Sequence, residues 1–366
     1  MAVMSDVLKA MDKEYGKGII TAGVKEVEAA RICTGVFPFD LATGGGFPEG
    51  KISIVWGKES SLKTTLCLLA IACYQQRHPD RSCVLVDVEN SYDPEWGRKL
   101  GVDNDRLYHV LPEYAEQAVD IIEGLLYADD AGLIVTDSLA ALITANEVKS
   151  SADKAVVGGT GLVIGKLYRK VTLALSAIRK DLADDSSDRE HQPTFVAINQ
   201  IRQKIGVMFG CPDTMPGGNA FKFASSMTIK VYGKDEFDKK IDPTLAVWKI
   251  CNGTIEKYKV PIVSRTFEFK MSIHKGTGLK VGRVNDWAFI SRYLKDLDYL
   301  TKGKKNKGWD CFDEHYKVLT DIQKRIRKDP EFADLVRNTI LANLQPEDED
   351  DYEDAELGDC LEEDAL

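Results

Sequence analysis

The chain has 366 residues, of which 44% are hydrophobic and 29% are charged, a balance typical of a folded protein larger than one small domain. No run of 18 apolar residues is present and the first residues lack an apolar signal-peptide core, so we expect neither a membrane span nor secretion. The net charge of −10 lies in the last twenty residues, since 347–366 carry 12 Asp or Glu and no Lys or Arg. The rest of the chain holds 48 basic against the remaining 46 acidic residues, a balance of +2.

The eight cysteines and five histidines are scattered along the chain, and no two cysteines form a C-x-x-C pair. This spacing argues against a structural zinc site and against a disulfide framework. It favours free thiols in a reducing cytosol. We therefore expect a cytoplasmic protein.

The first element is a short helix predicted at residues 5–15, where apolar side chains recur at helical spacing. Three glycines between residues 16 and 23 end this helix before the main pattern of the chain begins. A helix outside the main core suits an arm that docks on a neighbouring subunit. Residues 1–30 are therefore interpreted as an N-terminal oligomerisation arm.

Short apolar runs follow from residue 52, and segments long enough for helices separate the first of them. These runs are continuous rather than alternating, as in parallel strands that are covered on both faces. The predicted strands are 52–56, 83–89, 132–138, 194–200 and 227–232, with helices at 64–76, 115–127 and 160–182. Two later runs, 245–251 and 265–273, alternate more and are expected to extend the sheet antiparallel. This order predicts an α/β core with a mostly parallel sheet over residues 31–273.

The C-terminal part of the chain differs in pattern from the core. Helical periodicity returns at 286–300, 313–327 and 331–344, which predicts a small α-rich domain over residues 274–344. A basic segment, 302–307, lies between these helices. The acidic tail, 345–366, cannot bury enough apolar surface to fold and is expected to be disordered. Two roles stay open for the tail: a solubility tag, or a polyanion that competes with nucleic acid for a basic face.

The segment 57–65 lies between a predicted strand and a predicted helix and has the spacing of a phosphate-binding loop. It fits the pattern G-x-x-x-x-G-K-[ST] except at Leu62, which stands where the second glycine is expected. Backbone N–H groups at such a helix start point at phosphate oxygens, with Lys63 on the β- and γ-phosphates and the Thr64 hydroxyl on Mg²⁺. The pattern predicts a site for ATP and Mg²⁺, against the alternative of a chance turn rich in Ser and Lys.

Three polar residues stand at the ends of predicted strands, and the carboxyl ends of parallel strands meet at one edge of a sheet. Asp137 stands where a Walker-B carboxylate orients the water shell of Mg²⁺. Glu89 is a candidate to accept a proton from the attacking water, and Gln200 is a candidate to hydrogen-bond the γ-phosphate. Position alone does not separate Glu89 from a solvated glutamate at a strand end.

The segment after Gln200 mixes basic and apolar side chains without a clear period. Residues 201–210 include five apolar residues, and prolines and glycines follow at 212–218. Basic and apolar side chains interleaved in this way favour contact with nucleic acid in a loop that orders on its ligand. A flexible surface loop is the plainer alternative.

Together these residues resemble the bacterial RecA recombinase family and its phage relatives of the UvsX type. The resemblance extends from about residue 12 to 219 and more weakly to about 273. The segments that carry it are 17–18, 34–35, 59–66, 98–103, 137–142, 198–210 and 217–223. It implies a DNA-dependent ATPase with a P-loop core that forms a helical homo-oligomeric filament on single-stranded DNA, with ATP between neighbouring subunits. It also implies pairing with homologous duplex DNA in the cytoplasm of a bacterium or a phage-infected host, with single-strand-binding and loader proteins as candidate partners.

The resemblance implies roles for individual residues as well. The implied catalytic residues are Glu89 as the base, Lys63 and Gln200. The implied ATP ligands are Gly57, Glu59, Ser60, Ser61, Leu62, Lys63, Thr64, Thr65, and Asp93 and Trp96 at the adenine, with Thr64 and Asp137 at Mg²⁺. The implied DNA contacts are Arg169, Arg202, Gln203, Lys204, Ile205, Gly206, Gly217, Gly218 and Asn219. Lys222 and Phe223 are implied to contact the neighbouring subunit.

Some features depart from the bacterial pattern and favour a phage-borne member. These are Leu62, a poorly matched first DNA loop around 149–159, and the domain after residue 274. Lys257 and Lys259 are candidates for reaching ATP from the neighbouring subunit. Two other classes stay open, a ring helicase or motor with a similar core, and a filament protein that binds ATP but hydrolyses it poorly because of Leu62.

Overall fold

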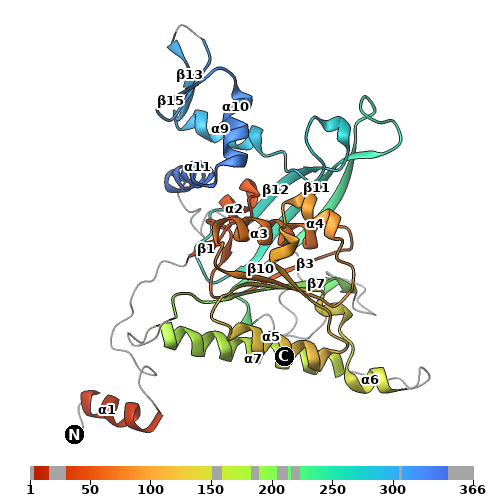
Figure 1. Cartoon of the computed structure of the whole chain (residues 1–366), viewed down its shortest axis with the longest axis vertical. Helices are drawn as coiled ribbons and strands as arrows, with labels where there is room; N and C mark the ends of the chain where they lie inside the picture. The colour runs from red at the N-terminus through yellow and green to blue at the C-terminus, as the bar shows by residue number, and fades with distance from the viewer. Residues whose placement is uncertain are drawn as a thin grey trace.

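A computed structural model describes residues 4–15, 30–150, 159–182, 189–203, 213–215, 223–304 and 307–344 (Figure 1). The expected N-terminal helix is present as α1 (Met4–Tyr15). The acidic tail, for which disorder is expected, lies outside these ranges, as does most of the poorly matched segment around 149–159. Among the described residues, no helix combines the length and the apolar character that a bilayer span requires.

One eight-stranded sheet forms the centre of the molecule. Its order is β12 (Thr266–Ser272), β11 (Ala246–Tyr258), β10 (Met227–Phe237), β3 (Ile52–Gly57), β7 (Thr194–Gln200), β6 (Ala131–Asp137), β4 (Ser82–Asp87) and β5 (Leu107–Val110). Neighbouring strands from β10 to β5 are parallel, whereas β11 and β12 are antiparallel. The predicted mostly parallel sheet with an antiparallel extension is therefore confirmed. The prediction missed β5, a four-residue edge strand without a buried side chain.

Helices cover both faces of this sheet (Figure 1). The helices α2 (Phe37–Ala42), α3 (Lys63–Arg77) and α4 (Pro94–Leu100) lie on one face, and α5 (Ala115–Leu126) and α7 (Gly159–Leu182) on the other. Successive strand residues alternate between the two faces. On β3, Val55 packs toward α3, while Ile54 and Trp56 pack toward α5 and α7. Both faces are thus buried, which explains why the strand sequences are continuously apolar.

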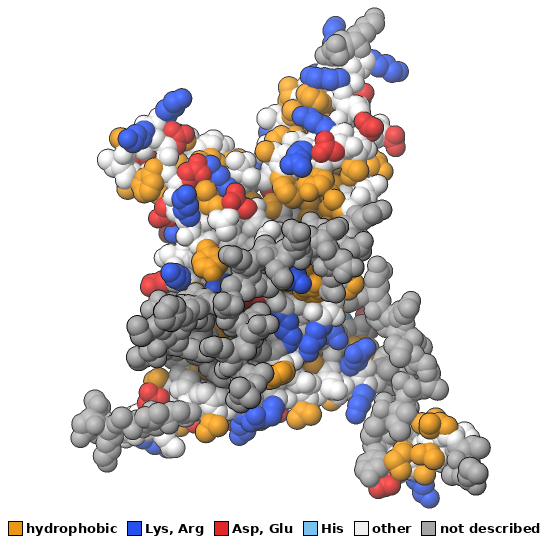
Figure 2. All heavy atoms as spheres, turned by 180° about the vertical axis from the view of Figure 1, so that it is seen from behind, with side chains coloured by type: hydrophobic (Ala, Val, Ile, Leu, Met, Phe, Trp, Pro, Cys, Tyr) orange, Lys and Arg blue, Asp and Glu red, His pale blue; other side chains and the backbone are white. Residues whose placement is uncertain are grey.

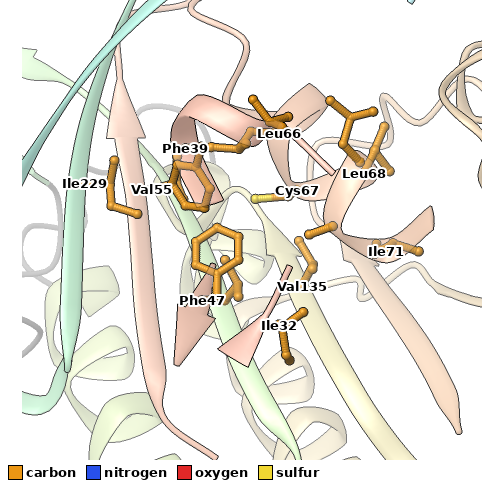
Figure 3. Packing of buried hydrophobic residues seen from close by; sticks show 14 of the residues in the cluster. Ile32, Phe39, Phe47, Val55, Leu66, Cys67, Leu68, Ile71, Val135 and Ile229 are labelled. Atoms are coloured by element: carbon orange, nitrogen blue, oxygen red, sulfur yellow. The ribbon is translucent and has the colours of Figure 1, made fainter. Parts of the chain in front are cut away.

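Aromatic residues pack on the sheet face that carries α3 and the predicted phosphate-binding loop 57–65. Phe39 of α2 and Phe47 of the short strand β2 (Phe47–Pro48) have ring centroids 5.1 Å apart. Both lie with Leu66 of α3 over Val55, as Figure 3 shows. The strand β1 (Arg31–Ile32) pairs with β2 and adds Ile32 to the same cluster. This packing holds the start of α3 against the end of β3.

The C-terminal elements form a third hydrophobic cluster, which also contains Phe37 and Leu41 of α2. Its helices are α9 (Trp287–Asp296), α10 (Leu319–Lys328) and α11 (Pro330–Asn343), and its strands are β13 (Leu300–Lys302), β14 (Trp309–Cys311) and β15 (Glu314–Tyr316). The predicted helix over 286–300 is too long, because Asp298 adopts a left-handed backbone that ends it. The predicted helix over 313–327 is wrong at its start, because a turn with left-handed Phe312 joins β14 to β15 there.

The remaining described elements are short. They are α6 (Ala145–Lys149), β8 (Arg202–Gln203), β9 (Asp213–Thr214) and the 3-10 helices η1 (Asn104–Arg106), η2 (Leu139–Ala141) and η3 (Lys275–Thr277). The strand β8 begins two residues after the end of β7 and pairs antiparallel with β9. The carboxyl ends of β3, β4, β6 and β7 therefore meet near the segment predicted to contact DNA.

Candidate nucleotide site and nucleic-acid interface

The phosphate-binding loop joins the end of β3 to the start of α3. Ser60 and Leu62 have φ of 59° and 68°, so both adopt a left-handed backbone. For a residue with a side chain this conformation costs about 1–2 kcal/mol, and Leu62 adopts it where the pattern expects glycine. Gly57 is required for packing, because a Cβ there would lie 2.2 Å from the carbonyl oxygen of Val231. The chain therefore builds the loop despite the replaced glycine.

Lys63 and Thr64 begin α3 and present their polar atoms at the loop. The Nζ of Lys63 donates to the carbonyl oxygen of Lys58 at 2.7 Å, and burial lowers the pKa of Lys63 against the attraction of Asp137. The Thr64 hydroxyl donates to Oδ2 of Asp137 at 2.6 Å. Burial raises the pKa of Asp137 to about 6, opposed by this hydrogen bond. A hydroxyl and a carboxylate oxygen in contact are hard oxygen ligands that suit Mg²⁺.

A cavity of about 380 Å³ opens beside the loop. Its wall is formed by residues 60–65 of the loop together with Trp96, Lys249, Met271 and Ile273. Trp96 of α4 is thus brought to the loop, whereas Asp93 caps α4 by accepting from the Glu95 N–H at 2.8 Å and is not in the wall.

Sequence reasoning missed the three wall residues from β11 and β12. Lys249 lies on β11 and is ion-paired with Asp235 at 2.9 Å, and Met271 lies on β12, with Ile273 just after it. They reach the loop because β11 pairs with β10 and β12 pairs with β11, on the side of the sheet next to β3. No motif marks them in the sequence, and their one signal is the alternating pattern of the late strands.

Glu89 is the centre of a second polar group at the same sheet edge. Its Oε1 accepts from the Gln200 side-chain amide at 2.6 Å and from the Ser138 hydroxyl. The backbone N–H of Glu89 donates to the Asp137 carbonyl oxygen at 3.3 Å, two residues beyond the end of β4. The structure therefore brings Glu89, Asp137 and Gln200 together from three strands.

Asp87, the last residue of β4, also shapes this edge and was missed by sequence reasoning. Its carboxylate accepts from the backbone N–H groups of Ser91 and Tyr92 at 3.1 and 2.9 Å, and it lies 3.2 Å from Nε2 of His109. These contacts hold the turn that carries Glu89. An aspartate two residues before a candidate base was the only signal available.

The predicted DNA contacts are only partly within the described residues. Lys204, Ile205, Gly206, Gly217, Gly218, Asn219 and Lys222 lie outside them, as do the side chains of Arg202 and Gln203. Arg169 is exposed on α7, where Lys166, Arg179 and Lys180 are exposed as well. Figure 2 shows Lys and Arg side chains gathered along the helix layer to which α5 and α7 belong.

Phe223 is 76% exposed, which is high for an aromatic side chain. Its carbonyl oxygen accepts from Nζ of Lys259 at 2.9 Å. The backbone at Phe223 is therefore held by Lys259, the residue directly after β11, while the Phe223 ring stays accessible. An exposed ring of this kind is a candidate contact for another molecule.

Comparison with known proteins identifies the family. The family model for the RecA N-terminal domain matches residues 2–278. The RecA protein of Aquifex pyrophilus is 39% identical over 346 residues, covering 92% of this chain and 93% of that protein. RecA of Aquifex aeolicus (strain VF5) is 40% identical over 227 residues, or 61% of each chain, and RecA of Cutibacterium acnes is 32% identical over 351 residues, covering 93% and 91%. The chain therefore belongs to the RecA family of recombinases, DNA-dependent ATPases that pair and exchange homologous strands.

Proposed function

We propose that the edge formed by the carboxyl ends of β3, β4, β6 and β7 binds ATP and Mg²⁺ and couples hydrolysis to single-stranded DNA. One observation carries this proposal. The Glu89 carboxylate accepts from the amide of Gln200, the residue at which β7 leads into the segment expected to contact DNA. The same carboxylate accepts from Ser138, which directly follows Asp137.

Each residue at this edge has a proposed task. Lys63 and the loop N–H groups hold the phosphates, and Thr64 with Asp137 holds the metal. Mg²⁺ neutralises phosphate charge when bound. Glu89 Oε1 takes the proton from the attacking water, and the Gln200 amide positions that carboxylate. Because Glu89 contacts Gln200 directly, a change at the DNA segment alters the position of the base.

The experiment compares Glu89→Gln and Lys63→Ala in nucleotide-binding and ATPase assays. Glu89→Gln should keep ATP binding and lose turnover by about a hundredfold or more, since it removes only the proton acceptor. Lys63→Ala should lose binding and turnover together. Glu95→Gln, an exposed glutamate on α4, is the matched control and should behave as the wild type. Normal turnover in Glu89→Gln would rule out the assigned base.

We also propose the assembly that the family resemblance implies, a cytoplasmic helical filament on single-stranded DNA that takes up homologous duplex. The exposed Phe223, and Lys257 and Lys259 on and after β11, support contacts with a neighbouring subunit. Electron microscopy with single-stranded DNA tests this, because rings or isolated subunits would contradict it. Leu62 in place of the loop glycine, a bulky residue as in UvsX-like proteins, supports a phage-type member, which the genes flanking this one would test.

The proposed domain division is an arm at 1–30, a core at 31–273, a C-terminal domain at 274–344 and a tail at 345–366. The hydrophobic cluster of α9, α10 and α11, to which the core adds Phe37 and Leu41 of α2, supports the third unit. Limited proteolysis tests the division, which predicts early cleavage near residues 30 and 345 and later cleavage near 274.

A further inference from the structure

Two cysteines from distant parts of the sequence meet in the core. Cys33 follows β1 and Cys73 lies on α3, and their sulfur atoms are 2.8 Å apart. Both side chains are buried. A disulfide bond has a length of about 2.05 Å, so a further approach of about 0.8 Å would bring the two sulfurs to bonding distance. Each of the four other described cysteines is buried as well, but only this pair is in sulfur–sulfur contact within the described part of the chain.

The surroundings of the pair favour a reactive thiolate. Nη1 of Arg77 donates to the Cys73 sulfur at 2.8 Å. The hydrogen bond from the Cys73 thiol lowers the pKa of Cys33 against burial and the charge of Asp40, with help from the positive charges of Arg77 and Arg337. The same hydrogen bond and burial raise the pKa of Cys73, so Cys33 is the thiolate of the pair and Cys73 the thiol. The thiolate is the nucleophilic form of cysteine, and neighbouring arginines stabilise it. The Arg77 guanidinium and the Cys73 thiol therefore favour a negative charge on the pair.

A small molecule has a route to the pair. A cavity of about 470 Å³ lies between α3 and the C-terminal helices, and Cys73 and Arg77 line it together with Arg337 of α11. It shares no lining residue with the cavity beside the phosphate-binding loop. A peroxide is far smaller than this volume. Cys73 is thus reachable without disturbing the nucleotide site, and Cys33 adjoins the same cavity through its chain neighbour Thr34, which also lines it.

We propose that Cys33 and Cys73 are a peroxide-sensitive dithiol that closes to an intrachain disulfide. The Cys33 thiolate attacks one peroxide oxygen and breaks the O–O bond, which yields a sulfenic acid and hydroxide. The Cys73 sulfur then attacks the sulfenic sulfur, and hydroxide leaves and combines with the Cys73 proton as water. In total, two thiols and one hydrogen peroxide become one disulfide and two waters. Thiol reductants reverse the step.

The experiment treats the full-length native chain with hydrogen peroxide, alkylates the remaining thiols and digests the protein with trypsin without reduction. The expected product is peptide 32–51 linked to peptide 64–77, lighter than their sum by two hydrogen atoms. Peptide 64–77 also contains Cys67, so fragmentation must place the link on Cys73. Adding a thiol reductant should restore the separate peptides.

Matched variants separate the dithiol from general oxidation. Cys67 lies on the same helix and is equally buried, so Cys67→Ala should still form the linked peptide. Cys73→Ala and Cys33→Ser should each abolish it, and the two variants serve as substitutes should one fail to fold. The proposal is overturned if the wild type gives no linked peptide, if the link falls on Cys67, or if Cys33 is converted to sulfinic acid without a link.

Discussion

At the scale of single residues, Leu62 is the clearest departure from its expected motif. Its left-handed backbone carries a penalty of about 1–2 kcal/mol that glycine does not pay. Glycine in turn lowers stability by about 0.4–1 kcal/mol because its unfolded chain is freer. Leu62→Ala loses the leucine contacts but keeps the backbone penalty. We expect Leu62→Gly to be more stable than Leu62→Ala by about 1 kcal/mol, measured by urea unfolding.

The alanine variant is the control for lost packing in this comparison, because both changes remove the same side chain. Leu62 is partly buried against the hydrophobic cluster over β3. Both variants lose this contact, so the lost packing cancels when their free energies of unfolding are compared. Equal stability of the two variants, or a more stable alanine variant, would show that the left-handed backbone carries no measurable cost.

Lys257 gives a prediction about pH. Burial, with the nearby charge of Lys259, lowers the pKa of Lys257 to about 8, so its ammonium is charged below that pH and neutral above it. A lysine that reaches a neighbour's phosphate acts only when charged. The ATPase rate of the filament should therefore fall as pH rises through about 8. Lys257→Arg stays charged and should remove this fall.

The control for this profile is Lys259→Arg, which keeps a positive charge beside Lys257 and should keep the fall in rate. Rates are compared on either side of pH 8. A profile that is the same in the wild type and in Lys257→Arg would remove Lys257 from the proposed site.

At the scale of elements, the end of β7 connects the two functions. Its last residue, Gln200, contacts Glu89, and the next residue, Ile201, donates its backbone N–H to the Gly57 carbonyl oxygen at 3.3 Å. We expect Gln200→Ala to bind DNA equally well with and without ATP, because the amide link to the nucleotide edge is lost. DNA affinity is measured by fluorescence anisotropy at fixed salt.

The matched control for this variant is Gln76→Ala, an exposed glutamine on α3. It should bind DNA more tightly with ATP, as the wild type does, and both variants should unfold at the wild-type denaturant concentration. A normal ATP-dependent gain in Gln200→Ala would disprove the coupling role.

Elements with a strong local pattern were predictable, and those that depend on tertiary contacts were not. The strands β3, β4, β6 and β7 are mainly apolar on both faces because both faces are buried. The short edge strand β5 and the β14–β15 hairpin carry little burial, so nothing in the sequence distinguished them. Their positions follow from pairing with neighbours.

The candidate site divides in the same way. Residues of the loop 57–65 are consecutive and follow a motif, so the sequence pointed to them directly. Glu89 and Gln200 were named from strand ends and family resemblance, and their direct contact became evident only in the folded sheet. Lys249 and Met271 belong to late strands whose alternating pattern is their one local signal, and the strand order brings them to the loop.

At the scale of the whole molecule, some basic side chains of the C-terminal part have partners within the fold. Arg325 is ion-paired with Glu314 and, at 3.3 Å, with Asp329. Lys302 lies 3.8 Å from the ring centroid of Trp309 in a cation–π contact. The two carboxylates offset the charge of Arg325, whereas the contact with Trp309 leaves the charge of Lys302 in place. A tail that competes with DNA therefore has fewer free partners than the sequence indicates.

Steady-state ATPase activity with and without single-stranded DNA tests most directly whether one sheet edge joins ATP hydrolysis to that DNA. The full-length chain should hydrolyse ATP faster when single-stranded DNA is added, because the Gln200 amide that holds the Glu89 carboxylate would transmit DNA binding to the proposed base. Lys63→Ala should show no activity in either condition, which excludes a contaminating ATPase. An ATPase rate that is unchanged by single-stranded DNA would contradict the account.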